Sequence, residues 1–298
     1  MFPTCGHLSF VGTTVFDDMG RRVFCPKTPS RIVSLVPSDT YSLSRLGCGE
    51  KLVGRTDFCE LPVEALKLPS VGGTKNVRVK DVLDLKPDLV IANQEENTRP
   101  VLEKIAQAKV PVYISFPRRV EDGFAHLAKM MRLLESTREL VVKLFFKEAY
   151  GLKNDTTLGH GRRVFVPIWN EPLMTFSQDT YAHSLLEILG FVNVFAGDEL
   201  GDGREDLGKR SPLGADQNAR QKKRYPRLTM EDLLAKDIDM ILLPNEPFKF
   251  GSEHVERFKS LWPTSKKAPE VLLVDGKDLF WHGVHTIDAI GNLKMILS

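Results

Sequence analysis

The chain repeats one short pattern, and this repeat constrains its fold more than any other feature. Residues 84–97, DLKPDLVIANQEEN, contain a lysine, an aspartate, an apolar run and then a cluster of carboxylates and amides. Residues 231–248, EDLLAKDIDMILLPNEPF, follow the same order after a short helix pattern. A buried strand that ends in polar side chains is typical of open α/β sheets, where ligands bind outside the carboxyl ends of the strands. The repeat therefore predicts two similar α/β units.

The segments around the first copy alternate between strand and helix patterns. They follow one another in this order: strand 31–38, helix 39–46, strand 51–56, helix 79–85, strand 88–92, helix 98–108 and strand 110–115. This alternation predicts a parallel sheet with helices on both faces. The strands are apolar throughout, as expected for a sheet that is buried on both sides. Before them, a turn at Asp17–Gly20 predicts a hairpin.

Residues 121–154 show helix patterns alone. Phe124, Leu127, Met131 and Leu134 have the spacing of one apolar helix face. The sequence from Ser136 to Glu139 has the form of a capping box, which predicts that a second helix begins there. From Ser136 to Lys153 this helix would span about 25 Å. We therefore predict a backbone helix that links the two α/β units.

The second α/β run repeats the order of the first. Its predicted elements are strand 163–169, helix 179–190, strand 192–197, helix 229–236, strand 239–243, helix 253–261 and strand 270–276. The sequence predicts an α/β fold of two Rossmann-like lobes with parallel sheets, joined by a long backbone helix. The predicted domains are an N-terminal hairpin (1–30), an N-terminal α/β lobe (31–118), a helical connector (119–160) and a C-terminal α/β lobe (161–298) with a polar insertion (198–224).

Composition narrows the class of protein. Lys and Arg number 41 against 39 Asp and Glu, which argues against a nucleic-acid-binding protein with a basic face. No window is apolar over the roughly 18–20 residues that a membrane span needs. The first residues lack the basic and apolar regions of a signal peptide. We expect a cytoplasmic monomer for the chain as written, or a periplasmic protein if a leader has been removed.

Four cysteines in a chain of 298 residues do not form a disulfide framework. Cys5 and Cys25 flank the predicted hairpin, so a single disulfide between them is one alternative. The other alternative, which we favour, is that all four are free thiols in a reducing compartment.

Several longer motifs resemble one known family. RIVSLVPSDTYSLSRLGCGEKLVGRTDFCELP, VGGTKNVRVKDVLDLKPDLVIANQEEN and WNEPLMTFSQDTYAHSLLEILGFVNVFAG resemble the helical-backbone metal receptor superfamily, the class III periplasmic-binding-protein fold. Its members include the vitamin B12-binding and ferric-siderophore-binding proteins of ABC importers. The resemblance covers roughly residues 14–298 apart from the insertion, and it includes motifs of leaderless members. It implies two lobes bridged by a rigid helix, with the ligand bound in the cleft between them.

The resemblance also implies a membrane partner. In importer members, a glutamate on each lobe contacts arginines of the ABC permease. The position in the second lobe falls on Glu231, whereas the position in the first lobe falls on Lys80, next to Asp81. This inversion of charge puts the usual contact in doubt. The chain departs from B12-binding members again at Asn93 and Tyr225, where those proteins have tryptophan, while the aromatic residue at Phe58 is retained.

The polar cluster at Glu95, Glu96 and Asn97 admits two interpretations. Carboxylates are hard oxygen donors that suit a ligand or a metal. Acidic residues also favour the start of a helix, here the helix predicted at 98–108. Both interpretations remain open.

Other residues near predicted strand ends are candidates for ligand contact. Trp169 would either stack on a planar macrocycle or cover the sheet edge. Arg118 would pair with a carboxylate or phosphate of the ligand or remain in a solvated loop. The complete predicted set is Ser38, Phe58, Asn93, Glu95, Glu96, Asn97, Arg118, Trp169, Asn170, Tyr225, Glu246, Phe248 and Trp281.

A direct metal site is the alternative to a chelate site. His282 and His285 in FWHGVHT have a spacing that can present two imidazoles to one metal, and Cys59 would add a thiolate. This spacing on a loop is a weak signal, and we expect two surface histidines and a buried thiol instead.

The sequence therefore supports three hypotheses. The first is non-enzymatic binding of a small metal chelate, corrinoid-like or ferric-siderophore-like. The second is direct binding of a transition-metal ion. The third is an enzyme that uses carboxylates such as Glu96 and Glu246, but the chain contains no nucleophile elbow, phosphate loop or HExxH motif, so we predict that it is not an enzyme. We expect no covalent cofactor.

Overall fold

The computed structural model describes residues 12–136, 141–143, 146–147, 151, 158–196, 224–262 and 267–297. The chain divides into two compact units. We call the first lobe 1; it comprises Met1–Phe116 and Ala125–Lys143. Lobe 2 comprises Pro117–Phe124 and Leu144–Ser298. Each lobe contains one parallel sheet, which confirms the predicted α/β class.

Lobe 1 begins with the predicted hairpin. Strand β1 (Thr13–Phe16) pairs antiparallel with β2 (Arg22–Cys25), and Gly20 in the turn has a positive φ of 72°. The turn lies against the edge of the lobe 1 sheet, because the Asp17 carboxylate accepts a hydrogen bond from the backbone N–H of Ile114. An exposed strand edge invites pairing with other chains, and this turn covers part of it.

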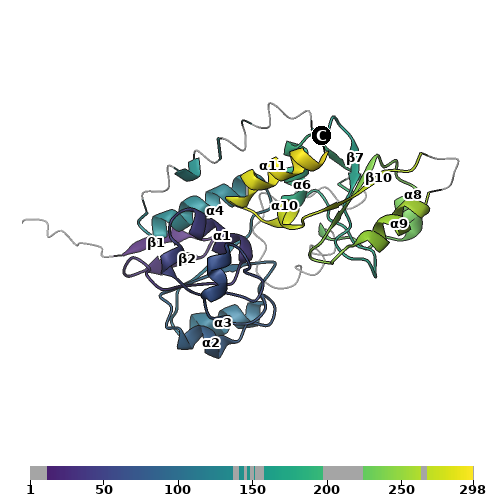
Figure 1. The fold of residues 1–298 in the computed structure, drawn as a ribbon. Coiled ribbons are helices and arrows are strands. Elements are labelled where there is room, and N and C mark those ends of the chain that lie inside the picture. The colour runs from purple at the N-terminus through teal and green to yellow at the C-terminus, as the bar shows by residue number, and fades with distance from the viewer. Residues whose placement is uncertain are drawn as a thin grey trace, which may run out of the picture. The chain divides into compact units, whose positions relative to one another are not determined.

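The sheet of lobe 1 has the strand order β4-β3-β5-β6. Its strands and helices, visible in purple to blue in Figure 1, are β3 (Ile32–Ser34), α1 (Pro37–Arg45), β4 (Leu52–Gly54), α2 (Val79–Asp84), β5 (Leu89–Asn93), α3 (Arg99–Gln107) and β6 (Val112–Ser115), with 3-10 turns at Gly49–Lys51 and Val63–Lys67. Val82 of α2 and Ile105 of α3 pack with Val90 and Ala92 on one face of this sheet. All residues of β5 are buried, as the apolar pattern predicted.

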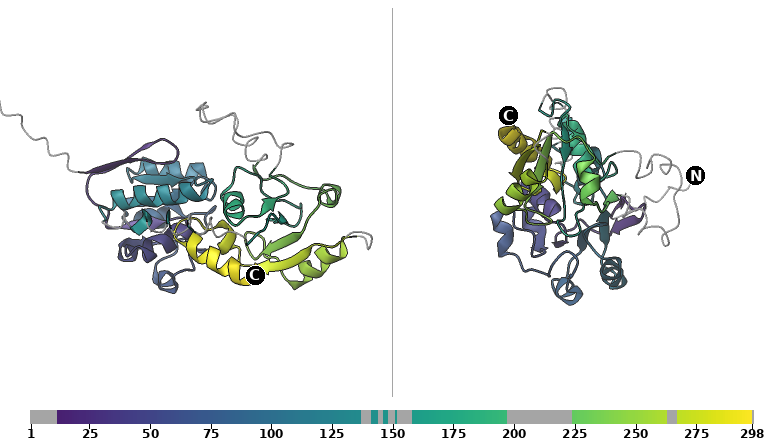
Figure 2. Two further views of the ribbon diagram at one scale, coloured as in Figure 1. Left: turned by 90° about the horizontal axis from the view of Figure 1, so that it is seen from above. Right: turned by 90° about the vertical axis from the view of Figure 1, so that its right-hand side faces the viewer.

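Lobe 2 contains a second parallel sheet, with the order β10-β9-β7-β8. Its elements, drawn in teal to yellow in Figure 2, are β7 (Arg163–Phe165), α6 (Tyr181–Ile188), β8 (Val192–Asn193), α8 (Met230–Leu234), β9 (Met240–Pro244), α9 (Ser252–Ser260) and β10 (Glu270–Val274). Leu233 of α8 and Phe258 of α9 pack on Ile241 and Leu243 of this sheet. The strands β7 and β8 are shorter than predicted.

The two sheets have the same topology. Numbered along the chain within each lobe, the strands are arranged 2-1-3-4 in both sheets. In such a sheet the chain leaves the first and third strands, which are neighbours, in opposite directions. Ligands bind between the carboxyl ends of these two strands. The relevant strands are β3 and β5 in lobe 1 and β7 and β9 in lobe 2. The duplication that the repeated sequence predicted is thus present.

The predicted connector is described only in its first half. Helix α4 (Val120–Leu133) is present, and Phe124, Leu127 and Met131 on its predicted apolar face are buried. Most of the backbone helix predicted from Ser136 to Lys153 lies outside the described residues, as does the insertion except for Arg224.

The C-terminal end differs from the prediction of a loop around the two histidines. The short helix α10 (Lys277–Phe280) precedes this segment, and His285 is the first residue of helix α11 (His285–Leu297). The sequence contained a signal for α11, because the buried residues Ala289, Ile290, Leu293 and Leu297 are spaced as one helix face. The segment Trp281–Val284 alone is the connection between the two helices.

Candidate functional site

In lobe 1, two buried amides hold the turn after β5. The Asn97 side chain accepts a hydrogen bond from the Asn93 backbone N–H (2.8 Å) and donates to the carbonyls of Leu35 (3.3 Å) and Thr74 (3.0 Å). The Asn93 side-chain oxygen accepts from the backbone N–H of Glu95 (2.7 Å). The turn is therefore fixed to the end of β3 and to the loop before α2. The predicted contacts of Asn93 and Asn97 with a ligand stay predictions, whereas the hydrogen bonds by which they hold this turn are present in the structure.

Glu95 and Glu96 are half-buried on this turn. Helix α3 has Thr98 at its N-cap and no acidic residue in its first turn. The capping interpretation is therefore wrong for both glutamates, because neither lies in the first turn of the helix. Their predicted contact with a ligand remains open. Ser38, another predicted contact, is buried in the first turn of α1.

Phe58 is the most exposed predicted contact in lobe 1, with 57% of its surface accessible. Its neighbour Cys59 is fully buried, as predicted, and lies 3.1 Å from the Thr40 hydroxyl, which donates to the sulfur. Burial raises the pKa of the Cys59 thiol, with a smaller opposing effect of hydrogen bonds from Thr40 and Thr56. A metal binds the thiolate, so a thiol that stays protonated is a poor metal ligand. Cys59 anchors the loop that presents Phe58.

The other described cysteines, Cys25 and Cys48, are also buried, and burial raises the pKa of Cys25 to about 11. Cys5 lies outside the described residues.

In lobe 2, an aromatic group follows the first strand of the sheet. Trp169 is 43% exposed, and its ring meets that of Phe248 edge-on with centroids 5.6 Å apart. The indole N–H donates to the carbonyl of Glu171 (3.1 Å), which fixes the orientation of the ring. Phe248 contacts Phe250 in turn (4.7 Å). Trp169 thus offers an exposed aromatic face that is held in place, as stacking on a planar ligand requires.

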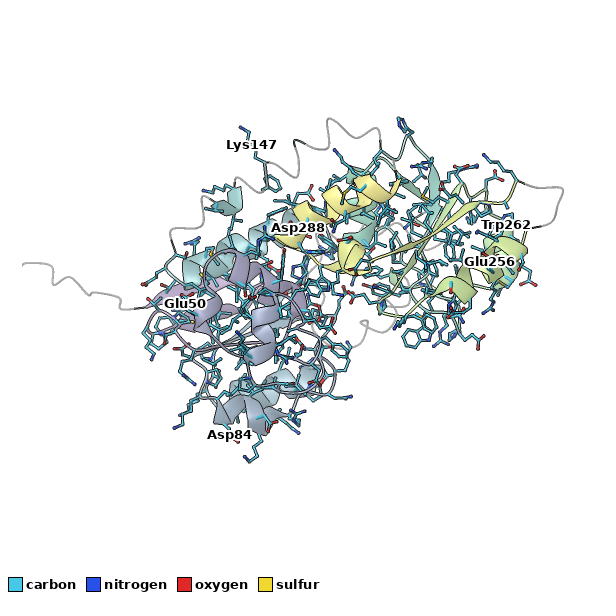
Figure 3. All side chains as sticks on the ribbon, in the orientation of Figure 1. Glu50, Asp84, Lys147, Glu256, Trp262 and Asp288 are labelled. Atoms are coloured by element: carbon cyan, nitrogen blue, oxygen red, sulfur yellow. The ribbon has the colours of Figure 1, made fainter. Side chains whose placement is uncertain are left out.

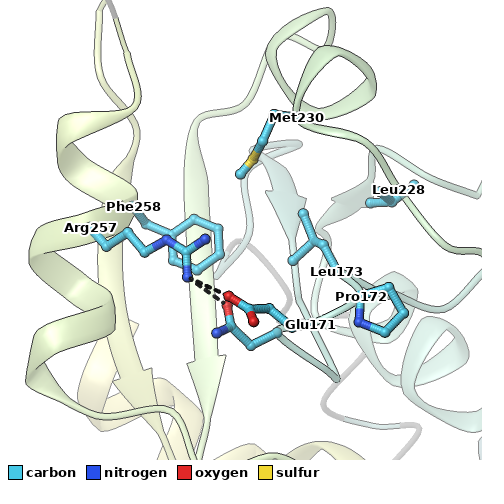
Figure 4. Close-up of a pocket in the computed structure, with 8 residues that line it drawn as sticks. Glu171, Pro172, Leu173, Leu228, Met230, Arg257 and Phe258 are labelled. Atoms are coloured by element: carbon cyan, nitrogen blue, oxygen red, sulfur yellow. Dashed lines mark hydrogen bonds and ion pairs between the residues drawn. The ribbon is translucent and has the colours of Figure 1, made fainter.

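A pocket of about 220 Å³ begins at Asn170 and Glu171, which follow Trp169 in the chain (Figure 4). Its walls are apolar and comprise Pro172, Leu173, Leu228, Met230 and Phe258. Polar side chains of Asn170, Glu171 and Arg257 border it. Arg257 donates to the Asn170 side-chain oxygen (3.2 Å) and lies 3.9 Å from the Glu171 carboxylate. Figure 4 shows the side chains of Arg257 and Glu171 pointing toward one another. Among the lining residues, the sequence had singled out Asn170 alone as a site residue.

Two backbone segments form the wall of this pocket. Ile168 donates to the carbonyl of Met174, and Met174 pairs with Arg227 in an isolated bridge. Leu228 donates to the carbonyl of Leu173 (2.8 Å). The segment 224–230 therefore runs along residues 173–177, and it brings Leu228 and Met230 to the turn that contains Trp169.

The turn after β9 has a different support from its counterpart after β5. The Asn245 side chain accepts a hydrogen bond from the backbone N–H of Gly276 (2.7 Å). A Cβ at Gly276 would lie 2.4 Å from the side chain of Glu246, so only glycine allows this approach. Glu246 is half-buried and lies 4.0 Å from the ammonium of Lys277.

Arg118 and Tyr225 belong to one charged group in lobe 2. Asp179 pairs with Arg118 (3.2 Å) and with Arg224 (3.4 Å). The Arg224 guanidinium lies over the Tyr225 ring, 5.4 Å from its centre. The structure pairs Arg118 with a carboxylate of the protein, that of Asp179, and its predicted contact with a ligand stays a prediction. Tyr225 is half-buried.

The two histidines of FWHGVHT are buried, which corrects the expectation that they lie on the surface. His282 is 4% and His285 6% exposed. The His285 ring is hydrogen-bonded to Asp278 (3.0 Å), which also accepts from Asn292 (3.0 Å). Sequence could not reveal this, because Asp278 lies on α10 and becomes a partner only when α10 packs on α11. Trp281 is buried too, with its ring 5.5 Å from that of His285.

The positions of the predicted permease contacts differ between the lobes. Glu231 is exposed in the first turn of α8, whose capping box uses Thr229 and Asp232. Lys80 is exposed on α2 and forms an ion pair with Asp84, which is labelled in Figure 3. Asp81 pairs with Arg78. The inversion of charge at Lys80 is therefore on the surface of lobe 1.

The model of the periplasmic binding protein family matches residues 32–260, which is more than half of the chain. The chain belongs to this family. Two relatives are vitamin B12-binding proteins. That of Pectobacterium carotovorum is 28% identical over 230 residues, 75% of this chain and 74% of the relative. That of Yersinia pestis is 27% identical over 168 residues, 56% of this chain and 60% of the relative.

Solved structures of similar fold agree with the family. The periplasmic vitamin B12-binding protein of Vibrio cholerae superposes with a TM-score of 0.68 at 21% identity, over 91% of this binding protein and 97% of that chain. A periplasmic heme-binding protein from Pseudomonas aeruginosa superposes with a TM-score of 0.69 at 20% identity, over 90% and 92%. Within the described ranges, no helix combines the length and apolar content needed to cross a membrane.

Proposed function

We propose that this binding protein takes up a metal chelate with a planar macrocycle, of the corrinoid type. The observation that carries the proposal is the exposed ring of Trp169, held by Phe248 and by the hydrogen bond to Glu171, in the loop that follows the first strand of lobe 2. Strand ends at this point of a 2-1-3-4 sheet are where α/β proteins bind ligands. Relatives named as vitamin B12-binding proteins support the corrinoid class.

Lobe 1, taken by itself, offers another set of groups that suit a corrinoid. Phe58 is exposed on a loop that Cys59 anchors, and Glu95 and Glu96 follow the third strand of its sheet. An aromatic ring would contact the macrocycle, and carboxylates would accept hydrogen bonds from the amide side groups that surround a corrin ring. Neutral amide side groups also agree with an Arg118 that is paired with Asp179 rather than left for an anionic ligand.

Direct binding of a bare metal ion is less well supported by these residues. The ring nitrogen of His285 that faces Asp278 is hydrogen-bonded, and the Cys59 thiol is buried and protonated. A ferric siderophore is the second candidate of the chelate type, since carboxylates such as Glu95 and Glu96 would contact its polar groups. We further propose delivery to an ABC permease, with Glu231 as the contact of lobe 2.

Titration of the purified protein with cobalamin, cobinamide, heme and ferric siderophores, followed by native mass spectrometry, tests this function. We expect a one-to-one adduct with a corrinoid at micromolar affinity or better. An adduct with heme alone or with a siderophore alone would contradict the corrinoid class, and a zinc-sized mass shift that His282→Ala abolishes would favour the metal-ion alternative.

A further inference from the structure

The apolar pocket of lobe 2 is bordered by Asn170 and Glu171, the two residues that follow Trp169, whose ring we assign to the macrocycle. Trp169 and Glu171 are linked by the hydrogen bond from the indole N–H, and Glu171 borders the pocket. Asn170, between them in sequence, borders it as well. A ligand whose ring lies on Trp169 therefore has a side pocket within reach of its periphery.

The size of the pocket decides what it holds. Sites that enclose a whole drug-sized ligand measure about 300–1,000 Å³, so 220 Å³ is too small for a macrocycle. An apolar cavity of about 150 Å³ binds benzene. A pocket of 220 Å³ with walls of Leu173, Met230 and Phe258 therefore suits one bicyclic aromatic group.

The polar border restricts how such a group enters. Arg257 and Glu171 neutralise each other at 3.9 Å, and the Asn170 side-chain oxygen already accepts from Arg257. The border thus presents no uncompensated charge that would select an anionic group. Burial of an uncharged ring against the apolar walls is the favourable interaction that remains, at about 25 cal/mol per Å².

We propose that this pocket is a subsite for an uncharged, bicyclic aromatic side group of the chelate, such as the benzimidazole base of a complete corrinoid. The subsite rests on the proposed function and adds to it a preference for the complete corrinoid over one that lacks the base. It also assigns Leu228, Met230 and Arg257 to ligand recognition, none of which stands out in the sequence.

Calorimetric titration of cobalamin and cobinamide, which differ in the nucleotide loop that carries the base, tests the subsite. The wild type should bind cobalamin about tenfold more tightly, the discrimination that an apolar pocket achieves for one well-packed group. Met230→Trp places a larger side chain in the apolar wall and so fills the pocket. It should reduce the affinity for cobalamin to that for cobinamide. Leu228→Trp repeats the test from the neighbouring segment. Met295→Trp, at a residue 76% exposed on α11, is the matched control and should change neither affinity.

Equal affinities in the wild type, or a preference that survives in both pocket variants, would overturn the subsite while leaving the proposed function intact. If the wild type binds neither corrinoid, the proposed function fails. The pocket is then tested separately, by titration with the free base 5,6-dimethylbenzimidazole. Millimolar binding of this base to the wild type and its loss in Met230→Trp would uphold the pocket as an aromatic site. Absence of binding to the wild type would overturn it.

Discussion

The two lobes share a strand order but stabilise the turn after their third strand in different ways. In lobe 1, Asn93 and Asn97 join the turn to β3 and to the loop before α2 through buried amides. In lobe 2, Asn245 makes one such bond, to Gly276, and Phe248 packs against Trp169. The apolar strands fix the topology, which is therefore the same twice. The turn residues do not determine the topology and differ between the lobes. The turn of lobe 1 is polar, whereas that of lobe 2 is aromatic.

The largest effect that separates the lobes should come from Asn97→Ala. This change removes an acceptor and two donated hydrogen bonds in a buried turn, and it leaves backbone groups of Asn93, Leu35 and Thr74 without that partner. We expect a loss of about 3 kcal/mol in the free energy of unfolding. Urea unfolding followed by circular dichroism measures it.

Asn245→Ala is the matched variant in lobe 2. One hydrogen bond is lost, so we expect about 1 kcal/mol. The three tryptophans, at 169, 262 and 281, all belong to lobe 2, so their fluorescence should follow Asn245→Ala and respond less to Asn97→Ala. Equal losses for the two variants would contradict the difference between the turns.

The second effect concerns the aromatic edge. Trp169→Ala should weaken corrinoid binding about tenfold, because the contact of an aromatic ring is worth about 0.5–1.5 kcal/mol beyond the area that it buries. Trp169→Phe should retain most of the affinity. Calorimetric titration measures both.

Phe58→Ala is the corresponding change in lobe 1. Phe58 has no ring contact to another aromatic side chain within the described part of the chain, so less of its orientation is fixed in advance and we expect a smaller loss than at Trp169. A larger loss at Phe58 would show that lobe 1 provides the main aromatic contact.

The stability of lobe 2 should depend on pH through one buried histidine. Burial lowers the pKa of His183 on α6 of lobe 2 below its ordinary value of 6.5, and the opposing effect of Glu187 is smaller. Below pH 6.5 the folded protein therefore binds fewer protons than the unfolded chain. The contribution of neutral His183 to the free energy of unfolding is present above pH 6.5 and is lost as the pH falls through the pKa of His183 in the folded protein. Unfolding followed by tryptophan fluorescence at pH 7.5 and at pH 5 compares the free energy of unfolding at the two pH values. His183→Gln should reduce the difference between the two pH values, and an unchanged difference would assign it to another group.

The smallest effect is expected at the surface. Lys80→Glu restores the charge of importer members on lobe 1, where Lys80 now pairs with Asp84. Exposed charges interact only weakly through water, so binding to an ABC permease should strengthen about two- to fivefold. Glu231→Lys is the comparison in lobe 2 and should weaken binding. No change for Lys80→Glu would show that its charge does not limit the contact.

Much of the fold followed from local pattern. The buried run Leu89–Asn93 was predictable because its side chains are apolar on both faces of the sheet. The start of α3 was predictable to within a residue, since Thr98 precedes a helical pattern. Helix α11 was not predicted, although its buried residues Ala289, Ile290 and Leu293 have the spacing of one helix face.

The sequence by itself determined two α/β lobes of one family and the exposed aromatic residues at their strand ends, because hydrophobic periodicity and turn residues act over a few neighbouring positions. Only the tertiary structure decided which polar residues were already engaged. His285 finds Asp278 on another helix, Arg118 finds Asp179, and Asn97 finds the carbonyls of Leu35 and Thr74. The pocket likewise forms where the turn after β7, the segment before α8 and α9 meet. Most of these contacts join residues far apart in the chain, and that of His285 joins two different helices, so the partners are set by packing rather than by the neighbouring sequence.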